Sequence, residues 1–146
     1  MMTAVTVARL LESKGNQVWS VSPDASVYAA LQLMEEKGVG ALLVLDGEEL
    51  AGVMSERDYA RKVILQGKSS RETPVRAIMS KKVYYVRPDQ RIEECMAVMT
   101  QKAVRHLPVM EGEALVGIIS IGDVVKAIIS EQRFIIDQLE QFITGR

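Results

Sequence analysis

The sequence has very little of the material from which disulfides and metal sites are built. Its 146 residues include one cysteine and one histidine. A single cysteine cannot form an internal disulfide, and the two residues together cannot supply the four ligands of a structural zinc site. A chain of this length can bury a full core without such staples. We therefore expect a protein of a reducing compartment, with a cytoplasmic location.

Excess charge of one sign and long apolar runs are also missing. The 18 basic and 19 acidic side chains give a formal net charge of −1, which argues against a nucleic-acid-binding surface. No apolar stretch approaches the roughly 20 residues that span a bilayer. The N-terminal segment is too short and too acidic for a signal peptide and resembles a transit peptide only weakly. We expect a soluble protein without a membrane or nucleic-acid partner.

The chain contains an internal repeat. Residues 21–64 align without a gap with residues 86–129, and about a third of the pairs are identical. Two unrelated helices would not match over so long a run, so the chain consists of two copies of one unit. We predict the following parts: a first domain at 5–66, a linker rich in serine, glycine and charge at 67–74, a second domain at 75–130, and a C-terminal helical extension at 131–146.

Each copy predicts the same order of elements, β-α-β-β-α. A short apolar strand comes first, at 18–21 and at 83–86. Apolar residues then recur at helical spacing. The Pro-Asp pair that precedes each helix predicts Asp24 and Asp89 as N-caps.

Two apolar runs joined by an acidic-Gly turn follow in each copy, around Gly47 and Gly112. This pattern is typical of a β-hairpin. A second helix comes next, at 56–66 in the first copy and from Ile121 in the second. The fold class is therefore mixed α/β (α+β), with a three-stranded sheet and helices on one face of each copy. A pseudo-two-fold axis between the copies would let them bury their other faces on each other.

The end of each hairpin carries the pattern Gly-h-h-Ser-x-x-Asp, where h is apolar. A serine at a helix start lies beside free backbone N–H groups that attract a phosphate. An ionised aspartate can accept hydrogen bonds from both hydroxyls of a cis-diol. The same spacing is also a capping box, which needs no ligand. We interpret the pattern as functional because it recurs in register, while capping alone stays an alternative for both copies.

These motifs, together with Val104–Val109 before the second hairpin, resemble a pair of CBS domains (cystathionine-β-synthase domains, or a Bateman module) over about residues 5–130. The chain is similar to stand-alone two-CBS-domain proteins of bacteria and plant mitochondria. The resemblance implies a regulatory, signal-transduction role without catalysis. It implies that an adenine nucleotide (AMP, ADP or ATP) binds in two clefts between the repeats and modulates an unidentified partner protein.

The resemblance also implies site residues. The motif aspartate would bind the ribose, the motif serine would lie near the phosphate, and apolar residues of both repeats would enclose the adenine. The first cleft is expected to contain Val53, Ser55, Arg57, Asp58, Met79, Val104 and His106. The second is expected to contain Leu11, Val39, Ala41, Ile118, Ser120 and Asp123.

The two clefts are not equivalent in sequence. Arg57 flanks the first motif, whereas Gly122 stands at the matching position of the second. Because an arginine beside a helix start adds a charge-assisted partner, we expect the Asp58 cleft to bind the tighter or more highly charged ligand. The first copy also has Leu43 where the second has Pro108, a departure from the family pattern.

Catalytic and metal-binding groups are not indicated. The only histidine lies in a predicted strand, and Cys95 lies on an apolar helix stripe, which predicts a core position. Without a nucleophile, base and acid we expect no enzyme. Two alternatives to nucleotide sensing remain: a redox-linked regulator that binds NAD(H), and a scaffold protein with empty clefts.

Apolar residues at helical spacing continue beyond the second copy, with Ile128, Ile135 and Phe142 seven residues apart. A helix with this stripe either folds back on its own module or packs on a second subunit. We favour the second interpretation and predict a homodimer.

Overall fold

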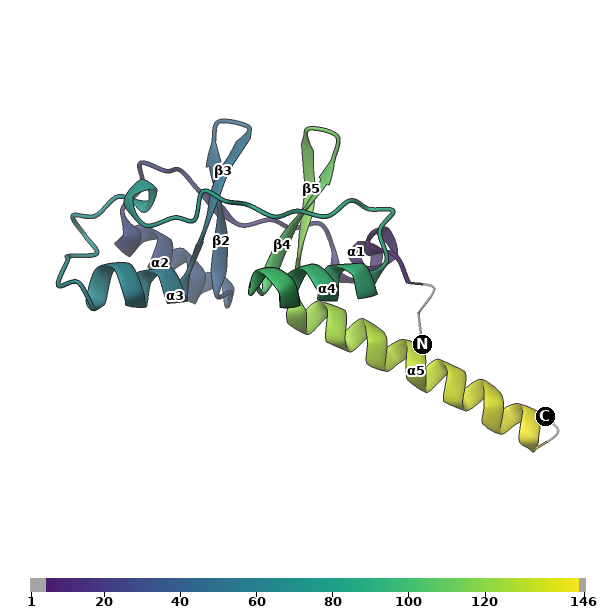
Figure 1. Cartoon of the computed structure of the whole chain (residues 1–146). Helices are drawn as coiled ribbons and strands as arrows, with labels where there is room; N and C mark the ends of the chain where they lie inside the picture. Colours follow the sequence, from purple (N-terminus) through teal and green to yellow (C-terminus); the bar gives the residue numbers. More distant parts are fainter. Residues whose placement is uncertain (1–4, 145–146) are drawn as a thin grey trace. The chain divides into compact units, whose positions relative to one another are not determined.

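The structure is a computed structural model that describes residues 5–144 (Figure 1). Residues 1–4 of the N-terminal segment and residues 145–146 of the predicted C-terminal extension lie outside the described residues. The chain divides into two compact units. One comprises Val18–Val83, and the other comprises the segment up to Gln17 together with the chain from Tyr84. We call them the first-motif unit and the second-motif unit, after the Ser-x-x-Asp motif that each contains.

The first-motif unit is built on a three-stranded sheet in the order β1-β2-β3. Its elements are β1 (Ser20–Val21), α2 (Val27–Lys37), β2 (Ala41–Asp46), β3 (Glu49–Ser55), α3 (Glu56–Tyr59), a π-helical turn η1 (Ala60–Ile64) and a 3-10 turn η2 (Val75–Ala77). β1 and β2 are parallel, and β2 and β3 form the predicted antiparallel hairpin. The helix predicted at 56–66 thus changes from α to π geometry after one turn.

The second-motif unit is built on the antiparallel hairpin β4–β5. Its elements are α1 (Val7–Lys14), α4 (Ile92–Lys102), β4 (His106–Glu111), β5 (Ala114–Ser120) and α5 (Ile121–Ile143). Val86 makes a single parallel bridge to Val109 where the sequence predicts a strand at 83–86. That predicted strand is wrong beyond this one residue.

A proline accounts for the missing strand. In the first-motif unit the Leu43 amide donates to the Trp19 carbonyl, 3.3 Å away, and extends the parallel pairing of β1. Pro108 occupies the matching place in β4 and has no N–H to donate. The pairing therefore stops at the two hydrogen bonds on either side of Val86, from its amide to Pro108 and from the Met110 amide to its carbonyl.

The predicted N-caps Asp24 and Asp89 are also wrong. α2 begins after Ser26, whose hydroxyl accepts a hydrogen bond from the Ala29 amide at 3.0 Å. α4 begins after Arg91, which makes no side-chain cap. The Pro-Asp pairs lie in the turns before the helices, too far upstream to reach the free amides of the first helical turn. Asp24 instead forms an ion pair with Arg76.

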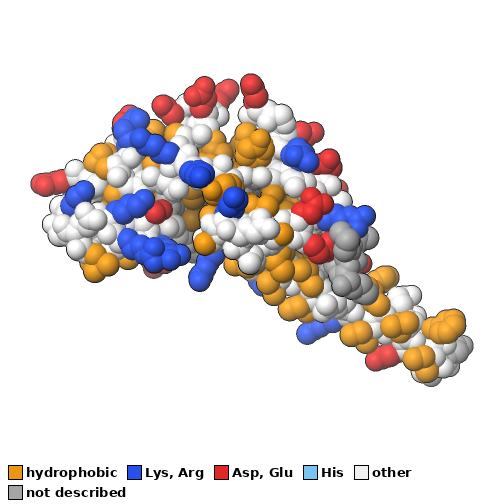
Figure 2. Space-filling view, in the orientation of Figure 1, with side chains coloured by type: hydrophobic (Ala, Val, Ile, Leu, Met, Phe, Trp, Pro, Cys, Tyr) orange, Lys and Arg blue, Asp and Glu red, His pale blue; other side chains and the backbone are white. Residues whose placement is uncertain are grey.

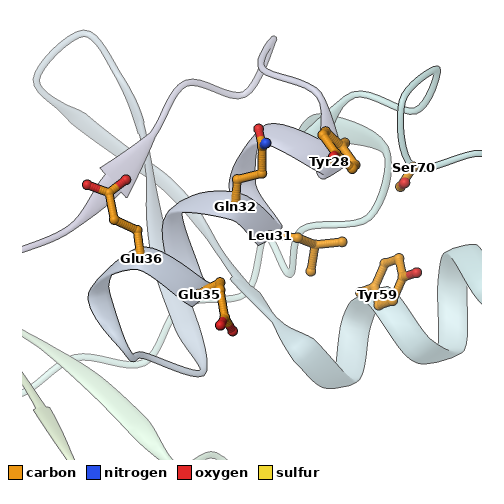
Figure 3. A pocket seen from close by; sticks show the side chains of 7 residues that line it. All are labelled: Tyr28, Leu31, Gln32, Glu35, Glu36, Tyr59 and Ser70. Atoms are coloured by element: carbon orange, nitrogen blue, oxygen red, sulfur yellow. The ribbon is translucent and has the colours of Figure 1, made fainter.

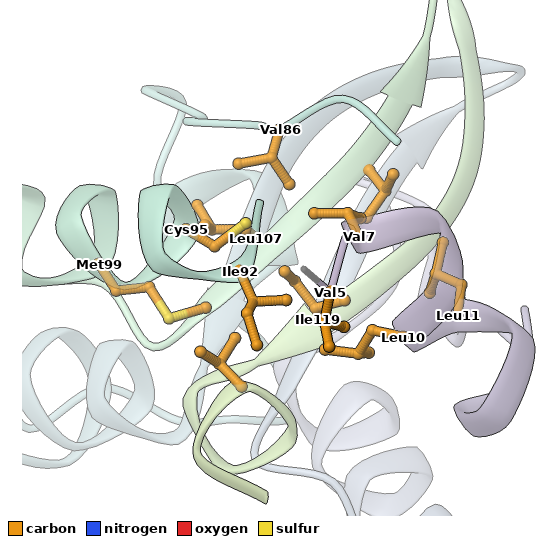
Figure 4. Packing of buried hydrophobic residues seen from close by; sticks show 12 residues of the cluster. Val5, Val7, Leu10, Leu11, Val86, Ile92, Cys95, Met99, Leu107 and Ile119 are labelled. Carbon is orange, nitrogen blue, oxygen red and sulfur yellow. The ribbon is translucent and has the colours of Figure 1, made fainter. Parts of the chain in front are cut away.

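The segment before the first repeat belongs to the second-motif unit, and the segment before the second repeat belongs to the first-motif unit. α1, which the sequence analysis did not predict, packs with α4, β4, β5 and the start of α5 in one core (Figure 4). Ile78 and Met79, after the predicted linker, are buried in the core of the first-motif unit. Cys95 is fully buried, as predicted, and burial raises the pKa of its thiol to about 11.

Matching glycines let these segments approach the hairpins. A Cβ at Gly52 would lie 2.7 Å from the Ser80 carbonyl oxygen, and a Cβ at Gly117 would lie 2.9 Å from a methyl group of Leu11. Both distances are closer than a real Cβ tolerates, so a side chain at position 52 would displace the Ser80 backbone, and one at position 117 would displace the flexible end of Leu11.

Candidate functional site

The first motif forms a capping box at the junction of β3 and α3. Ser55 is extended (φ −119°, ψ 164°), and its hydroxyl accepts a hydrogen bond from the Asp58 amide at 3.2 Å. In return, Oδ2 of Asp58 accepts from the Ser55 amide at 2.9 Å and from the Ser55 hydroxyl at 3.0 Å. The strand register and this box together fix the carboxylate at the start of the helix.

The second motif repeats this geometry at the junction of β5 and α5. Ser120 has φ −109° and ψ 165°, and its hydroxyl accepts from the Asp123 amide at 3.2 Å. Oδ2 of Asp123 accepts from the Ser120 amide at 2.8 Å. Capping is thus confirmed for both motifs. It does not exclude binding, because a carboxylate has about four acceptor positions and the cap uses only some of them.

A lysine lies beside each motif aspartate, and the two lysines come from different elements. In the first motif, Lys62 in η1 is 3.3 Å from Oδ1 of Asp58 and donates to the Ile78 carbonyl at 2.9 Å. In the second motif, Lys14 at the end of α1 is 2.6 Å from both Oδ2 of Asp123 and the Ile118 carbonyl.

Sequence reasoning missed Lys14, although one signal could have found it. Leu11 was already expected at the second site, and Lys14 lies three residues further on. Residues three apart occupy the same side of a helix, so recognition of α1 would have placed both side chains toward Asp123.

The surroundings of the second motif shift two pKa values. Burial alone would raise the pKa of the Asp123 carboxyl, but hydrogen bonds from Lys14 and Ser120 outweigh it and hold the pKa below its ordinary value. His106 lies opposite Ser120 in the β4–β5 register. Burial, followed by the positive charge of Lys14, lowers the pKa of His106. The neutral imidazole is favoured there, while the aspartate stays ionised.

The first-motif unit brings together seven of the expected site residues. Ala41 lies opposite Ser55 in the register of the hairpin. Val53 pairs with Ser80, and Met79 packs at Gly52. Arg57 is exposed beside Asp58 and forms no ion pair within residues 5–144. The set comprises Val39, Ala41, Val53, Ser55, Arg57, Asp58 and Met79.

The second-motif unit brings together the other six. Leu11 packs at Gly117, and Val104 packs against the core at the entry to β4. The Ile118 carbonyl accepts from Lys14. The set comprises Leu11, Val104, His106, Ile118, Ser120 and Asp123. The assignment of Val104 and His106 to the Asp58 cleft, and of Val39 and Ala41 to the Asp123 cleft, stays a prediction.

The cavities differ in their relation to the motifs. One of about 590 Å³ lies between α2 and α3, where Leu31 and Tyr59 approach each other and Glu35 and Glu36 supply negative charge (Figure 3). It includes neither Ser55 nor Asp58, and its acidic rim disfavours a phosphate. Another, of about 650 Å³, lies between α1 and α5 and is lined by both Lys14 and Asp123.

Neither a metal-ligand cluster nor a membrane-spanning helix occurs in the described part of the chain. Residues 5–144 contain no group of three or more His, Cys, Asp or Glu side chains placed to hold a metal ion. None of the helices within that range is both long and apolar enough to cross a bilayer. The cytoplasmic location stays a prediction.

Comparison with known proteins identifies the family. The model of the CBS domain matches residues 5–64 and again residues 75–130. The CBS domain-containing protein CBSX3, mitochondrial, of Arabidopsis thaliana is 38% identical over 97% of this chain and 73% of its own length. The chain belongs to the CBS domain family, as the resemblance predicted.

Solved structures agree with this family. A signal-transduction protein with CBS domains from Burkholderia ambifaria has a TM-score of 0.85 and 52% identity, covering 88% of this chain and 96% of its own. The CBS domain pair of protein MJ0100, in complex with 5′-methylthioadenosine and S-adenosyl-L-methionine, has a TM-score of 0.75 and 19% identity, covering 88% and 97%, and shares the fold. The chain is a CBS pair of the regulatory, signal-transduction type, and proteins of this type are generally non-catalytic.

Proposed function

We propose that this CBS pair is a non-catalytic sensor that binds an adenine nucleotide of the AMP, ADP or ATP type through its Ser-x-x-Asp motifs and thereby modulates a partner protein. The observation that carries the proposal is the duplicated motif geometry. In both copies a half-buried carboxylate lies next to a serine hydroxyl at a helix N-terminus, with a lysine within 3.3 Å.

Each part of this arrangement suits one part of a nucleotide. The carboxylate can accept from the two ribose hydroxyls. The helix start and its neighbouring lysine favour a phosphate because both supply positive potential. Apolar side chains near the motifs, such as Met79 and Leu11, offer surfaces for the base. The adenosyl ligands of the MJ0100 pair support this ligand class, although at 19% identity the likeness extends to the fold alone.

A thermal-shift panel tests the ligand class. The protein is melted alone and with AMP, ADP, ATP, NAD⁺, NADH, adenosine, 5′-methylthioadenosine and S-adenosylmethionine. A ligand at a hundred times its dissociation constant should stabilise the fold by about 2.7 kcal/mol. We expect stabilisation by at least one adenine nucleotide. Stabilisation by NAD(H) alone would favour the redox-linked alternative, and no shift with any compound would favour a scaffold with empty clefts.

Binding regulates a partner only if the ligand prefers one conformation of the module. Limited proteolysis with and without AMP tests this requirement. The sensor proposal expects cleavage sites to change in rate when AMP is added. Identical cleavage kinetics at saturating AMP would contradict it.

We also propose that the protein is a homodimer that uses the second half of α5. The first half of the apolar stripe packs on its own unit, with Val124 fully buried. The second half is uncovered, and Phe142 is 83% exposed. Figure 2 shows these hydrophobic side chains along the outer part of the helix. A second copy would cover this face and remove its apolar side chains from water.

Analytical ultracentrifugation tests the dimer. Leu139→Asp combined with Phe142→Asp should convert dimer to monomer, because a carboxylate would be buried at the centre of the helix contact. Leu65→Asp is the control, since Leu65 is an exposed apolar residue of the first-motif unit, outside α5. A wild-type monomer at micromolar concentration, or a double variant that remains dimeric, would contradict the proposal.

A further inference from the structure

The contact between Lys14 and Asp123 joins two segments that are far apart in the sequence. Lys14 is the last residue of α1, and Gly15 ends the helix with a positive φ of 100°. The ammonium group lies 2.6 Å from Oδ2 of Asp123 and 2.6 Å from the Ile118 carbonyl oxygen. Two short hydrogen bonds, one to the carboxylate and one to a backbone carbonyl, therefore hold the ammonium group beside Asp123.

This contact occupies an acceptor that a ribose would use. Oδ2 of Asp123 already accepts from the Ser120 amide at 2.8 Å. With Lys14 added, both acceptor positions of that oxygen are filled. A cis-diol that hydrogen-bonds to both carboxylate oxygens must therefore displace Lys14 from Oδ2.

The first motif is arranged differently. There the lysine contacts Oδ1 rather than Oδ2, and at the longer distance of 3.3 Å. Oδ2 of Asp58 also has two donors within residues 5–144, but both come from Ser55, its amide and its hydroxyl. A hydroxyl can rotate away from the carboxylate without leaving a charge unpaired. The lysine and the serine are thus on different oxygens in the first motif and on the same oxygen in the second.

Displacement of Lys14 leaves an ammonium group without its counterion. Its side chain is 30% exposed, so water replaces the lost carboxylate only in part. An uncharged ligand offers nothing in return, whereas a ligand phosphate gives the ammonium a new anion. Arg9, Lys126 and Glu131 also line this cavity of about 650 Å³, so besides Lys14 and Asp123 it has two cations against one carboxylate.

We propose that Lys14 is a specificity-determining latch, which closes the Asp123 motif to uncharged ribosides and opens it to phosphorylated ones. The latch rests on the proposed nucleotide-binding function. Lys14 leaves Asp123 when a ligand phosphate takes the place of the carboxylate, and the diol then binds the released oxygen.

Calorimetric titration of the full chain with AMP and adenosine tests the latch. All proteins carry Asp58→Ala, so that binding reports on the Asp123 motif. In this background the ratio of AMP affinity to adenosine affinity is measured with Lys14 intact and with Lys14→Met. We expect the ratio to fall at least about tenfold in Lys14→Met, because AMP loses a charge-assisted partner while adenosine no longer competes with an ammonium.

Two further variants separate the latch from general effects. Lys126→Met removes a cation from the same cavity without a contact to Asp123, and should leave the ratio within about twofold. Lys14→Arg keeps the cation and should keep the preference for AMP. Circular dichroism melts verify that each variant is folded, and Lys14→Gln replaces Lys14→Met if the latter is not.

The outcomes distinguish the two proposals. If Asp58→Ala binds AMP but the ratio stays unchanged in Lys14→Met, the latch is overturned and nucleotide binding stands. An equal fall in Lys126→Met overturns it as well, because the effect would then be general electrostatics. If the wild-type chain binds no adenine nucleotide, the proposed function fails and the latch fails with it.

Discussion

The two Ser-x-x-Asp motifs share their local geometry and differ in what surrounds them. Their serines have φ values of −119° and −109°, and the same pair of reciprocal hydrogen bonds closes both boxes. The contacts from beyond the motif differ: a lysine from the same helical segment contacts Asp58, and a lysine from α1 contacts Asp123. The hydrogen bonds within each motif are thus duplicated with the sequence, whereas the lysine that contacts each aspartate comes from a different element in the two units.

A second difference between the units lies in their sheets. Leu43 and Pro108 occupy matching positions, and only leucine has an amide to extend the parallel pairing. The same unit that lacks this strand pairing has the longer helix, with 23 residues in α5 against four in α3. The two units therefore differ both in the sheet that precedes the motif and in the helix that follows it.

Leu43→Pro should have the largest effect on stability. It removes the hydrogen bond to Trp19 in the central strand of a three-stranded sheet and should destabilise the protein by about 3 kcal/mol. Urea unfolding measures the loss. Leu43→Met keeps the amide and nearly the same volume, and should change the free energy of unfolding by less than about 1.5 kcal/mol. Equal losses in the two variants would show that packing, and not the backbone bond, distinguishes the units.

Replacing each of the two matching glycines by alanine should destabilise the protein more where the neighbour is backbone than where it is a flexible side chain. Gly52→Ala drives a Cβ against the Ser80 carbonyl, which is backbone, and should lose about 2 to 3 kcal/mol. Gly117→Ala meets the end of the Leu11 side chain, which can shift, and should lose about 1 kcal/mol. Denaturant melts compare the two variants. A larger loss for Gly117→Ala would show that the Leu11 side chain is held more rigidly at its hairpin than the Ser80 backbone is.

The single histidine reports on the second motif without a ligand. Burial and the charge of Lys14 lower the pKa of His106, so removal of that charge in Lys14→Met should raise it. The sign follows because a nearby cation disfavours the protonated imidazole. NMR titration of the untagged protein gives the pKa directly, and Lys14→Arg, which keeps the positive charge, should change it less. No change in Lys14→Met would mean that Lys14 does not lie at the motif in solution.

Local signals made much of the fold predictable. The acidic-Gly turns predicted both hairpins, and the Ser-x-x-Asp spacing predicted both capping boxes, because each depends on residues only a few positions apart. The predicted cap Asp24 is wrong because Ser26 directly precedes the first apolar residue of α2 and caps the helix. Asp89 is wrong because α4 begins two residues further on, after Arg91, which makes no side-chain cap. The strand at 83–86 is predicted from its own residues, whereas its backbone pairing is limited by Pro108 in the neighbouring strand.

The features that could not be predicted from the sequence depend on contacts between residues that are far apart in the chain. Lys14 and Asp123 are 109 residues apart, and their contact could be predicted only by recognising α1 as a helix that carries Lys14 on the same side as Leu11. α1 is not predicted because it lies outside the aligned repeat, although its apolar residues complete the core of the second-motif unit. The thirteen expected site residues lie around the two motifs, but how they combine into clefts depends on contacts that no local pattern encodes.

The most direct test of the central claim is the calorimetric titration of AMP into four proteins: wild type, Asp58→Ala, Asp123→Ala and the double variant. The motif aspartates are proposed to accept the ribose hydroxyls, so the wild type should bind AMP and each single variant should lose part of that binding. The double variant, verified as folded by circular dichroism, should show no binding at concentrations that saturate the wild type. An AMP affinity and stoichiometry in the double variant equal to those of the wild type would contradict the account.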